Sequence, residues 1–285
     1  MTTLTPPPVP PSPPAPPQPP AQPPATTRSA SRVVAILTIA LGGALILGAL
    51  GTAALGALGS ATRGAGGTLT ADAAGIRSLD VDVAAADLTI VYGGDEVTLD
   101  VDGAASDWRL RRDGGSLVVE TQRAWWSGIR PFAESDTAVL TLPRALERSA
   151  LDADISLSAG ALRAQGTYGE LDLTVSAGSM TVSGRASALE ADVSAGRLVI
   201  DLDRVQTADF TLSAGSVEGS LTGSAPRALT AELSAGRLAL VLPDDTYAVS
   251  TDASAGDVEN RLRVDPASPH RITISVAAGF ASLRS

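Results

Sequence analysis

The sequence has no cysteine, no lysine, a single histidine and only 3% aromatic residues among its 285 positions. Without cysteine, disulfide bonds and cysteine-ligated metal sites are excluded. The one histidine, His270, stands in a Pro-Ala-Ser-Pro-His turn. No histidine therefore accompanies the serines that recur through the second half of the chain, and nucleophilic catalysis by serine has no support.

Basic residues are also few: 21 arginines stand against 31 acidic residues, which gives a net charge of −10. All 31 acids and 18 of the arginines follow Arg63, so that part of the chain carries −13. A surface of this sign disfavours nucleic-acid binding, because phosphates need basic partners.

Proline is concentrated at the N-terminus, where 13 of the 19 prolines fall between Pro6 and Pro24. Such a run lacks backbone donors and a face that can pack, so we expect residues 1–32 to be a disordered, Pro-rich tail. Its Pro-x-x-Pro content could dock into an aromatic groove, but a solvated spacer is the simpler interpretation.

No charged residue occurs between Val33 and Thr62, and residues 33–60 are long enough to cross a membrane as one helix. Arg28 and Arg32 precede this run, which predicts a cytoplasmic N-terminus and an exported C-terminal part. A cleaved signal peptide is the alternative, but the preceding segment and the apolar run are both long for one.

Small residues recur at every fourth position of this span: Ala40, Ala44, Gly48, Thr52, Gly56 and Ser60. Such a stripe would let two membrane helices approach closely, although a helix rich in glycine and alanine also produces one by chance. Residues 61–75 then read as a short flexible linker.

The triplet Ser-Ala-Gly occurs six times after residue 157, followed by one degenerate copy, Ala-Ala-Gly. Its glycines are Gly160, Gly178, Gly196, Gly215, Gly236, Gly256 and Gly279. The copies follow one another at steps of 18, 18, 19, 21, 20 and 23 residues. A period of this size is typical of a chain that winds into stacked coils.

Apolar residues alternate with polar ones on both sides of each triplet, as in strands with one buried face. Before Gly178 they fall at Leu171, Leu173 and Val175, and after it at Met180 and Val182. A straight strand could not keep both sets inward, so the triplet must bend the chain. Small side chains permit the bend, and glycine can adopt φ > 0 there without steric cost.

These patterns predict an all-β fold for residues 76–285. We expect a single-stranded β-solenoid of ~18–21-residue coils, preceded by the transmembrane helix and the disordered tail. The glycines of the triplets would be its structural corners. Because the last coil ends almost at Ser285, its edge would be exposed and could associate with a second copy or a partner.

Many acids occupy outward strand positions: Asp80, Asp82, Asp152, Asp154, Asp172, Asp192, Glu232 and Asp252. Stacked carboxylates could hold Ca²⁺, but a solvated face that opposes aggregation is the more common meaning of such a pattern. No Asp-x-Asp-x-Asp-Gly loop occurs, so we assign no metal and no cofactor.

Residues 123–132 hold two of the three tryptophans and one of the three phenylalanines. Trp125, Trp126 and Phe132 are candidates for a contact with a partner, a glycan or the membrane interface. Alternatively they cap the N-terminal end of the coils, and we favour that role.

The strand pair at 108–119, the Ala-Val-Leu-Thr-Leu-Pro strand at 138–143 and the ladder of glycine-bearing corners resemble the bacterial putative adhesin family, a domain of unknown function often found behind a membrane segment. The resemblance covers about residues 76–285 and implies a β-solenoid; it supplies no catalytic residues. Residues after the corner glycine depart from the usual polar type, with Asp257 the one acid among them.

Together these features predict a single-pass protein of the cell membrane whose extracytoplasmic domain is a non-enzymatic, adhesin-like binding or scaffolding module. Its partner would be an envelope protein or a glycan, with a homo-oligomer possible through the membrane helix or the C-terminal edge. The alternative is an envelope regulatory protein that signals through its tail or helix. A carbohydrate-active enzyme is a distant third, because no paired-carboxylate groove is evident.

Overall fold

The computed structural model describes residues 66–121 and 136–285, which form an all-β fold. The strands are β1 (Gly67–Ala71), β2 (Ser78–Val83), β3 (Ala86–Tyr92), β4 (Val97–Asp102), β5 (Trp108–Asp113), β6 (Ser116–Thr121), β7 (Thr137–Leu142), β8 (Leu151–Val193), β9 (Arg197–Asp203), β10 (Thr207–Leu212), β11 (Ser216–Thr222), β12 (Ala228–Val241), β13 (Thr246–Ala253), β14 (Asp257–Asn260), β15 (Arg263–Val264) and β16 (Arg271–Arg284). Two short helices accompany them, η2 (Ala105–Asp107) and α2 (Arg144–Glu147). The predicted all-β class is therefore confirmed for residues 76–121 and 136–285.

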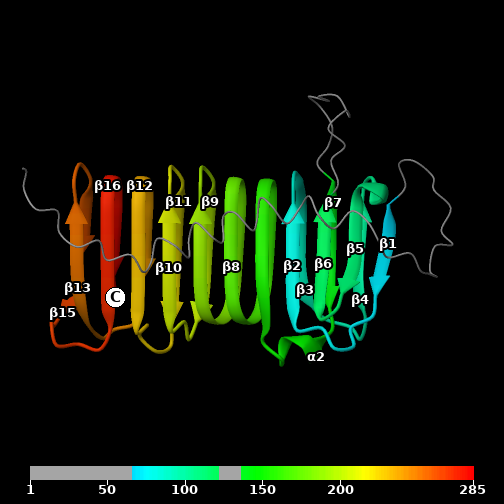
Figure 1. Ribbon diagram of the computed structural model, residues 1–285, viewed down its shortest axis with the longest axis horizontal. Helices are drawn as coiled ribbons and strands as arrows, with labels where there is room; N and C mark the ends of the chain where they lie inside the picture. The colour runs from blue at the N-terminus through cyan, green and yellow to red at the C-terminus, as the bar shows by residue number, and fades with distance from the viewer. Residues whose placement is uncertain (1–65, 122–135) are drawn as a thin grey trace, which may run out of the picture. The chain divides into compact units, whose positions relative to one another are not determined.

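The strands pair side by side into one 16-stranded sheet (Figure 1). This sheet folds into two walls that face each other across the core. One wall contains β2, β6, β10 and β13, and the other contains β3, β7, β9, β11 and β14. The long strands β8, β12 and β16 belong to both walls, because each passes from one to the other through a corner.

The predicted single-stranded β-solenoid was wrong. Five parallel strands, β8, β10, β12, β11 and β9, instead pair into a closed ring, and eleven further strands lie outside it. Three of the pairings, β1–β4, β4–β7 and β5–β6, are antiparallel. The Asp113–Gly114–Gly115 turn explains the last of these, because a tight turn returns the chain antiparallel to itself.

Neither helix in the described ranges is long and apolar enough to cross a membrane. The span predicted for residues 33–60 and the tail before it lie outside those ranges, and so does most of the linker.

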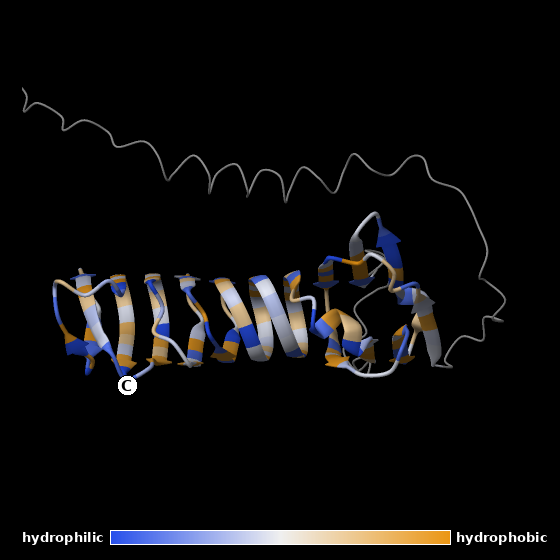
Figure 2. Ribbon diagram, turned by 90° about the horizontal axis from the view of Figure 1, so that it is seen from below, coloured by the Kyte–Doolittle hydropathy of each residue, from blue (hydrophilic) through white to orange (hydrophobic). Residues whose placement is uncertain are grey.

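The core between the walls consists almost entirely of aliphatic side chains. Leu171, Leu173 and Val175 before one corner and Met180 and Val182 after it are all buried. The apolar positions therefore change parity across the corner while both sets point inward. Figure 2 shows the resulting alternation of hydrophobic and hydrophilic bands along the strands.

Strand register follows the sequence repeat in the middle of the domain. Met180 pairs with Leu198, which pairs with Val217, which pairs with Leu238. These partners are separated by 18, 19 and 21 residues, as the steps between corners are. Beyond β12 the order changes, because Leu240 pairs with Leu283, 43 residues further on.

The last strand in the sequence is not the last strand in space. β16 pairs with β12 on one side and with β13 and β14 on the other. The exposed edge expected at the chain end is thus wrongly placed: it belongs to β13 and β14, and β15 covers part of it. β13 and β14 therefore cover β16. Opposite its inward residues Ile274 and Leu283 they carry the polar residues Thr251 and Asn260.

Candidate binding face

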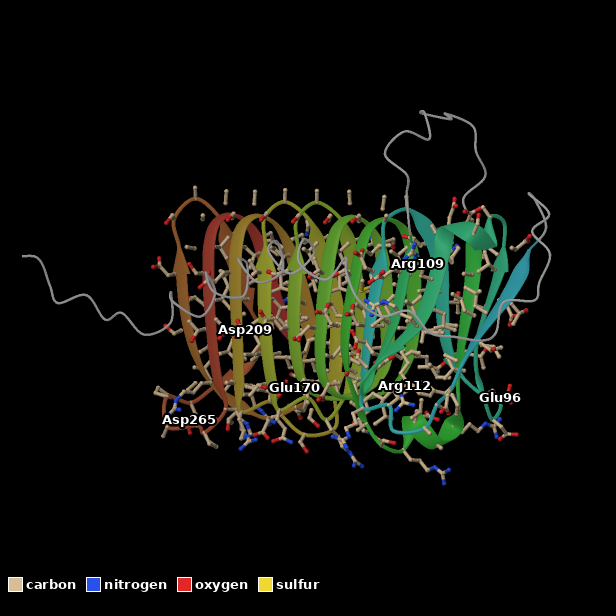
Figure 3. The ribbon with its side chains drawn as sticks, turned by 45° about the vertical axis from the view of Figure 1, so that its right-hand side comes forward. Glu96, Arg109, Arg112, Glu170, Asp209 and Asp265 are labelled. Carbon is tan, nitrogen blue, oxygen red and sulfur yellow. The ribbon has the colours of Figure 1, made fainter. Side chains whose placement is uncertain are left out.

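The wall that contains β2, β6 and β10 carries a dense set of outward carboxylates, some of which are visible in Figure 3. We call it the acidic wall and define it by Asp80, Asp82, Glu120, Asp154, Asp172, Glu190, Asp192, Asp209 and Glu232. All of these except the half-buried Glu120 are exposed. Alternation along the strands explains their common side, because the residue between each pair of acids points into the core.

Carboxylates of neighbouring strands stand directly beside one another on this wall. Asp80 is the register partner of Asp154, and Glu190 is the register partner of Asp209. Asp172 lies between these pairs and repels both Asp154 and Glu190. Since neighbouring strands are about 4.8 Å apart, the row places like charges at close range.

The surroundings raise the pKa of these carboxyl groups above the ordinary value. Partial burial between neighbouring strands is the main cause for Asp154, followed by repulsion from Asp80 and Asp172. The pKa of Glu190 is raised by burial and then by Asp172, Asp192 and Asp209. The row therefore holds negative charge at a free-energy cost that a bound cation would reduce.

Arginine does not neutralise this wall. Among residues 66–121 and 136–285, Glu120 is its one member with an ion pair, 3.1 Å from Arg111. A shallow depression of about 240 Å³ lies over its N-terminal part. Five carboxylates line this depression: Asp80, Asp152, Asp154, Glu170 and Asp172.

The opposite wall, which contains β3, β7, β9, β11 and β14, has a different character, and we call it the mixed wall. Some of its acids form ion pairs with arginines: Arg185 lies 3.2 Å from Asp203, and Arg197 lies 3.4 Å from Glu218. Arg237 also covers the ring of Phe280 at 5.1 Å. Unbalanced charge is thus concentrated on the acidic wall.

Alternation in the sequence indicated most of the acidic wall, but the analysis of residues alone missed Glu120, Glu190 and Asp209. Glu190 and Asp209 follow the same alternation as their neighbours and could have been found by it. Within the described part of the chain, no three acidic or histidine side chains converge as a metal site requires. The carboxylates of the acidic wall are spread along the strands and do not converge on one point.

The predicted corner glycines stack on one another. A methyl group at Gly178 would lie 2.7 Å from the carbonyl oxygen of Gly160, and one at Gly196 would lie 2.7 Å from that of Gly178. The stack continues through Gly215, Gly236, Gly279 and Gly256, in that order. Only Gly160 (φ +96°) and Gly279 (φ +128°) have a clearly left-handed backbone. For most corners glycine is required by the close approach of the next backbone, not by φ.

The three aromatic candidates, Trp125, Trp126 and Phe132, lie outside the described residues. Neither their role as a contact nor their role as a cap is tested. The lone histidine is described: its Nδ1 lies 3.0 Å from the carbonyl oxygen of Pro226, and its Nε2 lies 3.8 Å from Asp245. His270 therefore holds two loops together near β16.

No family model and no curated protein matches the sequence. Solved structures do resemble the fold. A "putative adhesin" from Parabacteroides distasonis is 13% identical, with 76% of this chain and 97% of that one covered and a TM-score of 0.50. One from Bacteroides fragilis is 12% identical, with coverages of 77% and 97% and a TM-score of 0.47.

A "putative lipid binding protein" from Parabacteroides distasonis is 9% identical, with coverages of 76% and 97% and a TM-score of 0.39. At such identities the likeness concerns the fold and not the activity.

Proposed function

We propose that this chain is a non-enzymatic binding or scaffolding module of the cell surface, and that the acidic wall is the face that binds. The observation that carries the proposal is the row of unpaired carboxylates on rigid, fully paired strands. The names of the structurally similar proteins agree with a surface role. Placement at the membrane rests on the predicted span 33–60 and stays a prediction.

The chemistry of the wall defines the kind of partner. Its carboxylates repel one another, so a partner with several positive charges relieves repulsion while it gains attraction. An extended segment rich in lysine and arginine, carried by an envelope protein, has this character. Because the charges lie near the surface, the attraction should weaken as salt shortens the Debye length.

Binding of a fluorescent decalysine peptide to the full-length chain in detergent micelles tests the proposal. The variant Asp154→Asn/Asp172→Asn/Glu190→Gln removes the centre of the row. We expect about a tenfold loss of affinity at low salt, since surface charge pairs contribute up to about 1 kcal/mol each and only part of that is lost here.

A matched control removes the same number of charges from the mixed wall: Asp201→Asn/Glu218→Gln/Glu259→Gln. This control should bind the peptide within about twofold of the unmodified chain at the same ionic strength. Equal losses in both variants would mean that only the net charge matters, and the acidic wall would then be no binding face.

A further inference from the structure

The C-terminal strand occupies a slot between parts of the chain that precede it. In Figure 1, β16 stands between β12 and β13, although β13 and β14 come earlier in the sequence. Its first half pairs with β12 and β13, and its second half pairs with β12 and β14. We define the slot as the space between β12 on one side and β13 with β14 on the other.

β16 is the strand through which the end of the domain is attached. Within the described residues, β13 pairs only with β15 and β16, and β14 pairs only with β16. The inward residues Ile272, Ile274 and Val276 are 1% exposed. In the filled slot, both edges of the apolar strand β16 are paired. An empty slot would leave the facing edges of β12 and of β13 with β14 without partners.

The loop that leads into β16, residues 265–270, is anchored by hydrogen bonds to the start of β13: the Asp265 N–H donates to the Tyr247 carbonyl oxygen at 2.9 Å, and the Ala248 N–H donates to the His270 carbonyl oxygen at 2.8 Å. The Ser268 hydroxyl donates to the Thr246 carbonyl oxygen at 2.7 Å, and His270 reaches the Pro226 carbonyl oxygen. The intervening residues 265–267 are exposed. These bonds fix the loop, whereas residues 271–284 themselves are held by pairing with β12 and with β13 and β14, and a second strand of the same sequence would make the same contacts.

We propose that β16 is exchanged between copies of this chain, so that residues 271–284 of one molecule fill the slot of another. The exchanged dimer and the monomer share every strand pairing and differ only in the path of the loop at 265–270. The partner is a second copy, because its β16 has the identical sequence and would make the same contacts with β12, β13 and β14. Exchange would join two acidic walls in one particle, but it does not depend on the proposed function.

Cysteine cross-linking tests the exchange directly, because the natural chain contains no cysteine. Thr230 of β12 and Thr273 of β16 are register partners at outward positions. Neighbouring strands lie at a distance that a disulfide can bridge. One full-length preparation carries Thr230→Cys, and a second, enlarged by a tag, carries Thr273→Cys. The two are mixed, warmed to just below the midpoint of unfolding, cooled and oxidised.

We expect a disulfide-linked heterodimer that forms roughly a hundredfold faster than by random collision, because exchange raises the local thiol concentration from about 10 μM in the mixture to about 1 mM. A mixture of Thr230→Cys with Ser183→Cys measures random collision, since Ser183 lies on the mixed wall beside Asp201. The double variant Thr230→Cys/Thr273→Cys checks that the two thiols meet within one chain.

A second pair, Ala239→Cys mixed with Ser282→Cys, repeats the test at another rung of the same ladder. Agreement of both pairs supports exchange even if one substitution weakens folding. If the double variant closes its internal disulfide while both mixtures give no more heterodimer than the collision control, the proposal is overturned.

Discussion

Stacked glycines occupy the line where the two walls meet, and each approaches the next through bare backbone. At Gly196 an added methyl group would meet Val175 Cγ1 and would lie 2.7 Å from the Gly178 carbonyl oxygen, although the φ of Gly196 is not left-handed. Gly196→Ala should therefore lower the free energy of unfolding by roughly 1–3 kcal/mol through overpacking. Urea unfolding followed by circular dichroism measures this change.

The matched control is Gly115→Ala, where the nearest atom to a new methyl group is the Gly75 carbonyl oxygen at an ordinary 3.6 Å. It should change the unfolding midpoint little. Equal losses of stability at both positions would show that the close stacking of corners does not set the cost.

Two tyrosines contrast in how their hydroxyl groups are satisfied. Tyr168 is 1% exposed, and its hydroxyl has no hydrogen-bond partner among the described residues, whereas the Tyr247 hydroxyl donates to the Pro243 carbonyl oxygen at 2.7 Å. Tyr168→Phe should stabilise the chain by about 1 kcal/mol, because it removes an unpaired buried group. Tyr247→Phe should destabilise it by a similar amount. Thermal unfolding compares them; a loss in both would mean that the Tyr168 hydroxyl is bound after all.

At the scale of strands, the terminal layer formed by β13 and β14 is a thin cover over β16. Ile274 is 1% exposed, while its register partner Thr251 is exposed at the equivalent inward position. Ile274→Ala should cost about 2–5 kcal/mol of unfolding free energy, and Thr251→Ala less than about 1 kcal/mol. Similar losses in chemical denaturation would contradict the assignment of Ile274 to the core and Thr251 to its end.

Strand positions were largely predictable from the sequence, whereas strand order was not. The alternation of Leu171, Leu173 and Val175 with polar residues indicates a strand wherever it occurs. Nothing in that pattern says which neighbour a strand takes, because every repeat offers the same aliphatic face. The insertion of β16 therefore escaped prediction: its residues resemble those of any other repeat, and only Thr251 and Asn260 mark the true end.

The candidate binding face shows the same limit. Every acid of the wall except Glu120 could be assigned to an outward position, because both of its neighbours in sequence are apolar. The difference in unpaired charge between the two walls could not be predicted. It depends on where arginines such as Arg185 and Arg197 lie relative to Asp203 and Glu218. Those pairs form between strands whose partners the sequence does not specify.

At the scale of the whole domain, the acidic wall should make the folded chain more stable in mild acid, where acidification more often lowers stability. The folded-state pKa values of Asp80, Asp154, Asp172 and Glu190 are raised, above 3.8 for aspartate and 4.5 for glutamate. The folded chain then binds more protons than the unfolded chain between the unfolded and folded pKa values, so stability falls as pH rises through that window. Stability contributed by these groups is fully present below the unfolded pKa values and lost above the folded ones.

We therefore expect the urea midpoint of the full-length chain to increase as the pH is lowered from neutral toward the raised pKa values. Asp154→Asn should stabilise the chain at neutral pH by up to about 1 kcal/mol, because it removes a like charge opposite Asp80, and it should flatten the pH dependence. Asp201→Asn is the matched control, since its register partners Ser183 and Ser220 are neutral, and it should keep the slope. A midpoint that falls steadily on acidification, with Asp154→Asn indistinguishable from Asp201→Asn, would show that repulsion along the wall does not limit stability. A cationic partner would then gain nothing from relieving it.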